Sequence, residues 1–410
     1  MPSASNLYII VFEMSKKSNN TIVIVGGGFG GIKAALELAR SGEFAVTLVN
    51  DQPDFRYNPT LYHTATGGLM RQSSISIASL LEGSSIKFVH GTAEKLDRKQ
   101  KTVKLADGTM LEYDTLVLAL GVVTNYFHIP GLAEYSFGIK SPAEVTRFKR
   151  HLHTLIKDEG KPDLNYIIVG GGPTGIELAG ALPAYLHKIM KDQHIKDRRV
   201  HIKLVEAAPR LLPRSNPKAS QAVARRLKKL GVEIMLGKTV EGESSDELTV
   251  DHKAIKSHTV VWTAGITNNP FFASNKFTLT DRGKVVIDEH LLAEKDIYVI
   301  GDNAGTPFSG LAQTAVYDGH FVAHDIEAKW YGNEGVPYHA KTPATVIPVG
   351  PGWAAFEYRK FVITGWLGWT IREAADWIGF HDLEPWWKAS EQWATEFGEE
   401  EDTPIAHDSD

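Results

Sequence analysis

The chain has 410 residues, of which 43% are hydrophobic and 23% charged, with a formal net charge of −5 and no cysteine. This composition is ordinary for a globular protein, and the acidic balance argues against a general affinity for nucleic acid. No run approaches the roughly 18 consecutive apolar residues of a membrane-spanning helix. The lack of cysteine excludes disulfides, thiolate nucleophiles, iron–sulfur clusters and redox-active thiol pairs.

Residues 1–18 are expected to form a loose tail, and a cytoplasmic location is the default because no signal-peptide pattern is recognised. The β-branched run Thr21–Val25 predicts a buried parallel strand. It leads directly into Gly26–Gly31, which fits G-x-G-x-x-G, and then into a helix that should stop at Ser41-Gly42. With the next strand, Phe44–Val49, this makes the strand–turn–helix–strand unit of a dinucleotide-binding fold.

Each position of this first motif has a predicted task. Gly26 permits the tight turn, Gly28 lets a pyrophosphate approach the backbone, and Gly31 allows the helix to pack closely on the strand. The free N–H groups at the start of the helix favour phosphate. Asn50 and Asp51 follow the second strand, at the place where a ribose would be bound.

The same pattern returns in the middle of the chain. The strand Tyr166–Val169 leads into Gly170, Gly172 and Gly175 with the same spacing, and a helix follows. The next strand, from 201 to 205, ends in Glu206, which comes later than usual because a polar stretch lengthens the connection. One such motif is a weak signal, but two copies in the same context predict an α/β protein with two Rossmann-like nucleotide-binding units.

A third landmark lies near residue 300. Asp296–Ile300 is a predicted strand that ends in Gly301-Asp302. A carboxylate in this place can accept hydrogen bonds from a ribityl chain that lies across the edge of the sheet, although Gly-Asp taken alone is also an ordinary turn.

With these landmarks, residues 20–397 resemble the glutathione-reductase-like flavoproteins with two dinucleotide-binding domains. The more specific resemblance is to the type II NADH:quinone oxidoreductases, the single-subunit NADH dehydrogenases. Further segments carry it: Asn58–Gly67, Leu116–Gly121 with Thr124–Phe127, Val205–Pro213, Val261–Ile266 and Leu311–Ala315.

The resemblance implies an order of domains. A disordered tail (1–18) would precede the first part of an FAD-binding domain (19–137), an inserted NAD-binding domain (138–270) and the second part of the FAD-binding domain (271–340). A C-terminal membrane-docking segment (341–397) and an acidic tail (398–410) would follow.

The resemblance also implies the cofactors, FAD and NAD(H), the latter as substrate. For FAD it implies Gly26, Gly28, Gly31 and Asp302, and for NAD(H) it implies Gly170, Gly172, Gly175 and Glu206. Further cofactor-binding positions are expected at Asn50, Asp51, Gly121, Gly265, Gly301 and Gln313. Two positions depart from the family pattern. Asn50 stands where an acid is usual, which should weaken the contact with ribose, and Tyr317 replaces a glutamine, which should reshape the quinone side of the flavin.

Hydride transfer from NADH to a flavin needs orientation and exclusion of water more than acid–base groups. The resemblance implies that Glu177 lies near the nicotinamide and flavin, where it orients the cofactor or relays protons. The alternative is a carboxylate favoured by the dipole of its own helix. Gln313, with Tyr317 beside it, is expected to line the quinone headgroup, or else Gln313 caps the helix that begins near Ala312. No metal is expected, because the histidines form no convincing ligand set.

The C-terminal segment carries six of the nine tryptophans. On a helix, Leu367, Ile371, Ala374 and Ile378 form one stripe flanked by Trp366 and Trp377, with Arg372 and Asp376 opposite. After a break at Gly379, a second stripe would hold Trp386, Ser390, Trp393 and Phe397. Such helices suit the surface of a membrane, here the inner face of the cell membrane, and the acidic residues that follow would weaken the attachment only over a short range. They equally suit the protein's own body or the partner of a homodimer.

The predicted function is transfer of a hydride from NADH to FAD and then of two electrons to a membrane quinone, without proton pumping. One alternative is a soluble NAD(P)H-dependent reductase of a protein acceptor, and another is a redox-sensing flavoprotein with slow turnover. Disulfide reductases and sulfide:quinone oxidoreductases share this fold but need thiols, so the absence of cysteine excludes them.

Overall fold

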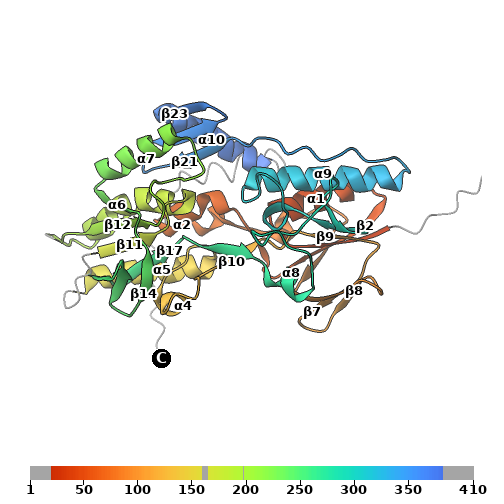
Figure 1. Cartoon of the computed structure of the whole chain (residues 1–410), viewed down its shortest axis with the longest axis horizontal. Helices are drawn as coiled ribbons and strands as arrows, with labels where there is room; N and C mark the ends of the chain where they lie inside the picture. The colour runs from red at the N-terminus through yellow and green to blue at the C-terminus, as the bar shows by residue number, and fades with distance from the viewer. Residues whose placement is uncertain (1–19, 159–164, 197, 382–410) are drawn as a thin grey trace, which may run out of the picture.

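The computed structural model describes residues 20–158, 165–196 and 198–381. Two mainly parallel sheets lie side by side with helices packed against them, and the C-terminal sheet lies above the second of them (Figure 1). The predicted α/β fold with two Rossmann-like units and a C-terminal amphipathic helix is confirmed.

The first sheet has six strands in the order β19-β20-β9-β1-β2-β5. Its strands are β1 (Asn20–Val25), β2 (Phe44–Asn50), β5 (Lys87–His90), β9 (Thr115–Leu118), β19 (Leu292–Glu294) and β20 (Ile297–Val299). All neighbours are parallel except the edge pair β19–β20. Alternate side chains of β1 enter two separate hydrophobic clusters, so both faces of the sheet are covered, as continuous β-branched strands predict.

Two long helices cover one face of the first sheet. They are α1 (Phe29–Arg40) and α9 (Ala312–Trp330), which lie next to each other in Figure 1. Their backbones are in close contact, since a Cβ at Gly319 would lie 2.3 Å from the carbonyl oxygen of Gly30. The other face is covered by the antiparallel strands β6 (Ala93–Asp97), β7 (Thr102–Leu105) and β8 (Met110–Glu112) and by helix α8 (Pro270–Ser274).

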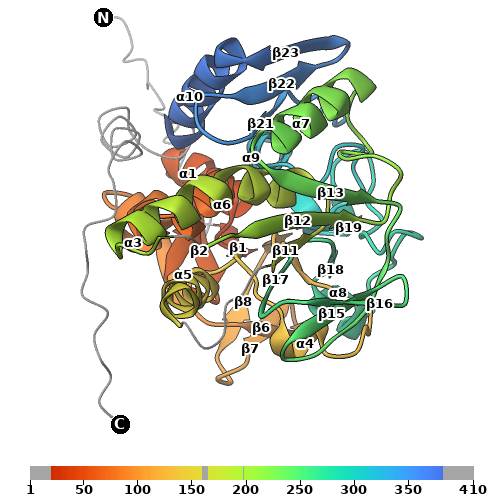
Figure 2. The same ribbon diagram turned by 90° about the vertical axis from the view of Figure 1, so that its left-hand side faces the viewer.

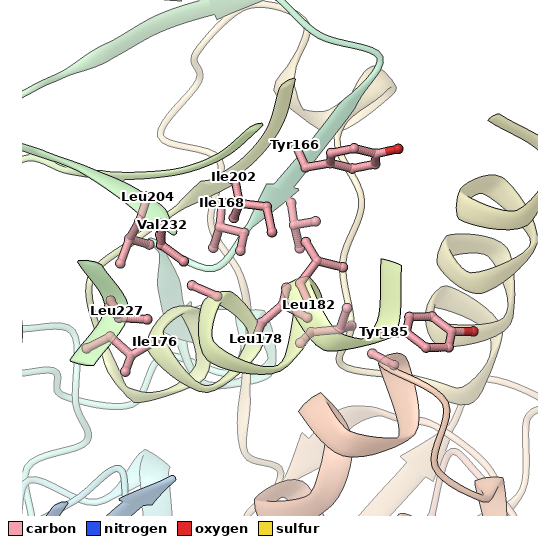
Figure 3. Close-up of a cluster of buried hydrophobic side chains, with 14 of the residues drawn as sticks. Tyr166, Ile168, Ile176, Leu178, Leu182, Tyr185, Ile202, Leu204, Leu227 and Val232 are labelled. Atoms are coloured by element: carbon pink, nitrogen blue, oxygen red, sulfur yellow. The ribbon is translucent and has the colours of Figure 1, made fainter. Parts of the chain in front are cut away.

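The second sheet is fully parallel, in the order β13-β12-β11-β17. Its strands are β11 (Asn165–Val169), β12 (His201–Glu206), β13 (Val232–Leu236) and β17 (Thr259–Trp262). One face packs on helices α5 (Pro142–Lys157), α6 (Pro173–Asp192) and α7 (Pro217–Lys229), and the other on strands β14 (Val240–Glu243), β15 (Glu247–Val250) and β16 (Lys253–Lys256). In Figure 3, Leu178 and Leu182 of α6 point toward Ile168 and Ile202 of the sheet.

Short elements join the two halves. Strands β10 (Val122–Thr124) and β18 (Ile266–Asn268) pair antiparallel where the chain leaves and re-enters the first half. Tyr185 of α6 lies next to α2 in Figure 3. The remaining short elements are β3 (Asp54–Arg56), η1 (Asn58–Thr60), α2 (Leu61–Ala65), η2 (Met70–Gln72), β4 (Ser74–Ser76), α3 (Ile77–Leu80), α4 (Leu132–Tyr135) and η3 (Gly301–Asn303).

The C-terminal unit consists of the antiparallel strands β21 (Thr345–Pro348), β22 (Ala354–Tyr358) and β23 (Phe361–Gly365), followed by helix α10 (Trp366–His381). It contacts the second half, where Arg226 of α7 donates hydrogen bonds to the carbonyl oxygens of Val349 and Pro351. Figure 2 shows this unit at the top of the molecule, above α6 and beside α7.

One detail of the C-terminal prediction differs from the structure. Helix α10 does not break at Gly379 but continues to His381. Gly379 lies against the ring of Tyr57, where the Cβ of a larger residue would come within 2.5 Å of the hydroxyl oxygen. The predicted stripe from Trp386 to Phe397 and both predicted tails (1–18 and 398–410) lie outside the described residues.

Candidate functional site: two glycine turns and the side chains beside them

The two glycine turns have nearly the same geometry. Gly26 and Gly170 have φ angles of +114° and +116°, which favour glycine. The third glycine of each motif packs against the first, because a Cβ at Gly31 would lie 1.9 Å from the carbonyl oxygen of Gly26, and one at Gly175 would lie 2.0 Å from that of Gly170. The helix can therefore follow the strand closely only if these positions are glycine.

The middle glycines face open space. A Cβ at Gly28 or at Gly172 would meet no atom of the protein within 4 Å. Each of these residues directly precedes a long helix, α1 or α6, whose first N–H groups have no partner within the helix. An anion is attracted to such a helix start, and the missing side chain leaves room for a bulky diphosphate. Both turns therefore fit a dinucleotide.

A side-chain acceptor at the end of the next strand lies beside each turn. Asn50 Oδ1 accepts a hydrogen bond from the Gly27 N–H at 2.7 Å, and Glu206 Oε2 accepts one from the Gly171 N–H at 2.5 Å. Glu206 Oε1 also accepts from the N–H of Ala208 at 2.7 Å. Asn50 and Glu206 occupy equivalent positions, which supports equivalent roles in the two halves. They differ in charge, because Asn50 is a neutral amide and Glu206 is a carboxylate. Asp51 is exposed, beyond the strand.

The Gly301-Asp302 turn is held by two buried residues that the sequence did not single out. Gly301 has a φ of +64° and donates its N–H to Asp318 Oδ2 at 2.9 Å. Asn303 exchanges hydrogen bonds with the backbone of Gly121, at 2.8 and 2.6 Å. These contacts bring Gly121, Gly301 and Asp302 together at the edge of the first sheet, next to the Gly26 turn. The adjacency of Asn303 to Gly301-Asp302 was the only signal in the sequence.

The carboxyl groups of Asp302 and Asp318 are both largely shielded from water. Burial raises the pKa of Asp302 from its ordinary value, and nearby Lys284 opposes the change. Burial likewise raises the pKa of Asp318 to about 6, although hydrogen bonds from Tyr338 and Gly301 act in the other direction. Asp302 is half-buried and so remains accessible to a polar ligand. Gly265, by contrast, belongs to the junction between the halves, where its carbonyl oxygen accepts from the N–H of Asn125 at 3.1 Å.

Glu177 lies in the second turn of α6, close to the C-terminal helix. Burial raises its pKa to about 7, and the charge of Arg372 on α10 acts in the opposite direction. Arg372 is only 4% exposed; it forms an ion pair with Asp376 and donates to the carbonyl oxygen of Pro59 at 3.1 Å. Glu177 therefore lies where α6 meets the C-terminal unit, with a proton that can be gained or lost near neutral pH.

Gln313 and Tyr317 lie one turn apart on α9 and contact the segment that connects α9 to β21. Gln313 Oε1 accepts from the backbone N–H of Ala344 at 3.0 Å, so Gln313 does not cap its own helix, which has no side-chain cap. The Tyr317 ring lies 5.6 Å from that of Tyr338, and the Lys341 ammonium is 4.1 Å from its centroid. Both predicted quinone-side residues thus lie on α9 against the segment that connects it to β21, whereas Glu177 lies on α6 near Arg372 of α10.

Helix α10 has its polar side inside and its apolar side outside. Arg372 and Asp376 are 4% and 3% exposed, whereas Trp366 and Ile378 are 69% and 55% exposed. Leu367 and Trp377 are exposed as well, as are Phe361 and Ile363 of the adjacent strand β23. Leu367, Ala374 and Ile378 of the predicted stripe are therefore exposed, whereas Ile371 is partly buried. Among the described residues, no helix is long and apolar enough to cross a membrane.

Substitution of the two open glycines should separate the two nucleotide sites. Gly28→Ala and Gly172→Ala introduce a methyl group that meets no protein atom, so both variants should fold. We expect Gly28→Ala to lower the FAD content of the purified protein at least tenfold, and Gly172→Ala to keep its FAD but raise the KM for NADH at least tenfold. Absorbance of the flavin and steady-state kinetics provide the measurements. Loss of FAD from both variants alike would contradict the assignment.

The comparisons with known proteins agree with this geometry. Residues 20–319 match the family described as pyridine nucleotide-disulphide oxidoreductase. A type II NADH:quinone oxidoreductase of Mycobacterium tuberculosis is 29% identical over 401 residues, which cover 88% of this chain and 84% of that protein. Another from Staphylococcus saprophyticus is 26% identical over 353 residues, covering 80% and 87%. The predicted family resemblance is confirmed.

Solved structures show the same fold. The NDH2 protein of Plasmodium falciparum in complex with NADH superposes with a TM-score of 0.83 at 16% identity, covering 93% of this chain and 98% of that one. The sulfide:quinone oxidoreductase of Aquifex aeolicus superposes with a TM-score of 0.74 at 19% identity, covering 91% and 92%. FAD and NAD(H), the predicted cofactors, agree with these findings. The match over residues 20–319, together with the two glycine turns, shows that this chain belongs to the pyridine nucleotide-disulphide oxidoreductase family.

Proposed function

We propose that this protein is a type II NADH:quinone oxidoreductase, which oxidises NADH and reduces a membrane quinone without pumping protons. The observation that carries the proposal is the combination of two open glycine turns with a helix whose apolar side faces outward. The turns fit two dinucleotides, and the apolar side fits a membrane surface, where a hydrophobic quinone resides. The relatives that bear this activity in their names support the proposal.

Residues of the first half would hold FAD, which supplies a two-electron acceptor and donor when bound. The α1 N-terminus and the Gly28 gap would receive its pyrophosphate, Asn50 would accept from a ribose hydroxyl, and Asp302 would accept from the ribityl chain. Asn50 is a weaker acceptor than a carboxylate, but its position beside the turn is equivalent to that of Glu206. The residues present therefore fit FAD.

The second half would bind NADH at the Gly172 gap. Glu206 has one oxygen toward Gly171 and the other toward Ala208, so its remaining lone pairs can accept from the ribose hydroxyls of NADH. The negative charge would repel a 2′-phosphate, which favours NADH over NADPH. Arg210 is engaged with the carbonyl oxygens of Leu212, Pro213 and Ser215, which leaves it poorly disposed to bind that phosphate.

Glu177 would move a proton. The overall reaction, NADH + quinone + H⁺ → NAD⁺ + quinol, consumes one proton. A carboxyl group with a pKa of about 7 can both hold a proton and release it at neutral pH. Release of this proton to an oxygen of the quinone would leave Glu177 as a carboxylate. The positive charge of Arg372 would partly stabilise that carboxylate.

The apolar side of α10 would lie on the membrane. Burial of a large apolar side chain contributes about 1.5–3 kcal/mol, so several exposed residues together would give stable attachment. The buried Arg372–Asp376 pair fixes how helix α10 is turned about its axis. If the helix were turned the other way, the apolar stripe would face the protein and the ion pair would lie in lipid, which is unfavourable. A homodimer that covers the same stripe is the alternative.

A stopped-flow experiment tests the function. NADH should bleach the flavin absorbance of the purified protein, and a quinone in detergent or liposomes should restore it faster than ferredoxin-type or other protein acceptors. A flavin that NADH reduces but that only a protein acceptor reoxidises would favour the soluble reductase. Slow turnover with every oxidant would favour a redox sensor.

The membrane contact is tested with single charges on α10. Leu367→Glu and Ile378→Glu change exposed positions, so folding should be unaffected. We expect both to lower liposome binding and quinone reduction at least tenfold, with ferricyanide reduction unchanged, since that oxidant is soluble. Met110→Glu, an exposed apolar position on β8, is the matched control and should behave like the wild type. If the variants change the oligomeric mass but not lipid binding, the stripe is a dimer interface.

The proton relay is tested by pH. Because the pKa of Glu177 is raised to about 7, its side chain is protonated below this pH and loses its proton above it. If quinone reduction needs the protonated form, kcat should fall as pH rises through about 7. Glu177→Gln, of the same size, should be at least tenfold slower and should lack this dependence. Reduction of the flavin by NADH, which needs no proton from the protein, should remain within about twofold. An unchanged pH profile would refute the relay.

A further inference from the structure

A cluster of potential metal ligands lies away from the nucleotide turns, where helices α1 and α9 face each other. Glu37 of α1 and His320 and His324 of α9 each offer one ligand atom, and these atoms lie within 4.8 Å of one another. The two histidines are four residues apart on one helix, so their rings are on the same side. Glu37 is 283 positions from His320 in the sequence, which is why spacing alone predicted no metal.

The distances are close to those of a coordinated ion. Glu37 Oε2 lies 2.8 Å from His320 Nδ1 and 3.9 Å from His324 Nε2. Ligand atoms about 2.1 Å from a tetrahedral Zn²⁺ are roughly 3.4 Å apart, so small rotations of the side chains would suffice. The carboxylate side chain is 14% exposed, whereas the histidines are 46% and 61% exposed, so an ion can enter from solvent.

The surroundings favour one orientation of His324. Its Nδ1 is 3.7 Å from Glu327 Oε2, while its Nε2 faces Glu37. A carboxylate near Nδ1 favours the tautomer that carries the proton there, which leaves the lone pair of Nε2 free for a metal. The only opposing charge among the described contacts of Glu37 is Lys33, 3.1 Å from its other oxygen, Oε1.

We propose that Glu37, His320 and His324 form a binding site for Zn²⁺ or another divalent transition metal that prefers imidazole. Two imidazoles and one carboxylate leave a fourth position for water, whereas Mg²⁺ and Ca²⁺ require sets of oxygen ligands. A bound ion would tie α1 to α9, two helices already in contact at Gly30 and Gly319. Helices α1 and α9 both begin at the proposed flavin site. The ion would therefore stabilise the packing of the two helices that carry residues of that site.

The test uses the full-length protein, free of any purification tag and stripped of metal with a chelator. Zn²⁺ affinity is measured by competition with a chromophoric chelator, and Co²⁺ provides a spectrum that reports tetrahedral coordination. We expect one tight Zn²⁺ ion per chain, weakened at least tenfold by His320→Gln and by His324→Gln. His187→Gln, an exposed histidine on α6, is the matched control and should bind as the wild type does. Lys33→Gln should bind more tightly, because it removes the opposing charge.

Thermal unfolding checks the site independently of activity. Zn²⁺ should raise the Tm of the wild type and of His187→Gln but not of His320→Gln or His324→Gln. Without metal, the variants should unfold at the same temperature as the wild type, since the substituted rings are largely exposed. The proposal is overturned if both variants retain the wild-type affinity, if His187→Gln weakens binding equally, or if Mg²⁺ displaces the Zn²⁺. These outcomes do not depend on the acceptor of the enzyme.

Discussion

The close contact between the first and third glycines of each motif is the constraint on which the rest of the structure depends. A side chain at Gly31 or Gly175 would collide with the carbonyl oxygen of Gly26 or Gly170, and the helix would move away from its strand. The position of the helix in turn sets where its first N–H groups point and how far the next strand lies from the turn. Asn50 and Glu206 accept hydrogen bonds from the N–H groups of Gly27 and Gly171, so the strand end meets the turn in the same way in both halves.

The sequence predicted those parts of the site that depend on local patterns. Strand, glycine turn and helix are contiguous, so β1, α1, β11 and α6 were expected close to where they occur. Contacts between distant segments were beyond reach, since nothing local shows that Asn303 holds Gly121 or that Gly319 packs on Gly30.

Helix α10 illustrates a limit of a different kind. Periodicity correctly placed Leu367 and Ile378 on one side and Arg372 on the other, but it does not show which side faces the protein. Burial of an ion pair usually costs free energy, and here hydrogen bonding to Pro59 and proximity to Tyr57 offset part of that cost. Only the three-dimensional structure shows that the polar side of α10 faces the protein and that its apolar side faces outward.

The C-terminal unit is attached to both nucleotide-binding halves, through Arg226 on one side and Arg372 on the other. Flavoproteins built from two such halves could otherwise flex at the two-stranded connection between β10 and β18. The C-terminal unit opposes rotation of one half against the other, because such a rotation would break the hydrogen bonds of Arg226 or of Arg372. The relative position of the two glycine turns is therefore restrained by contacts that lie far from either turn.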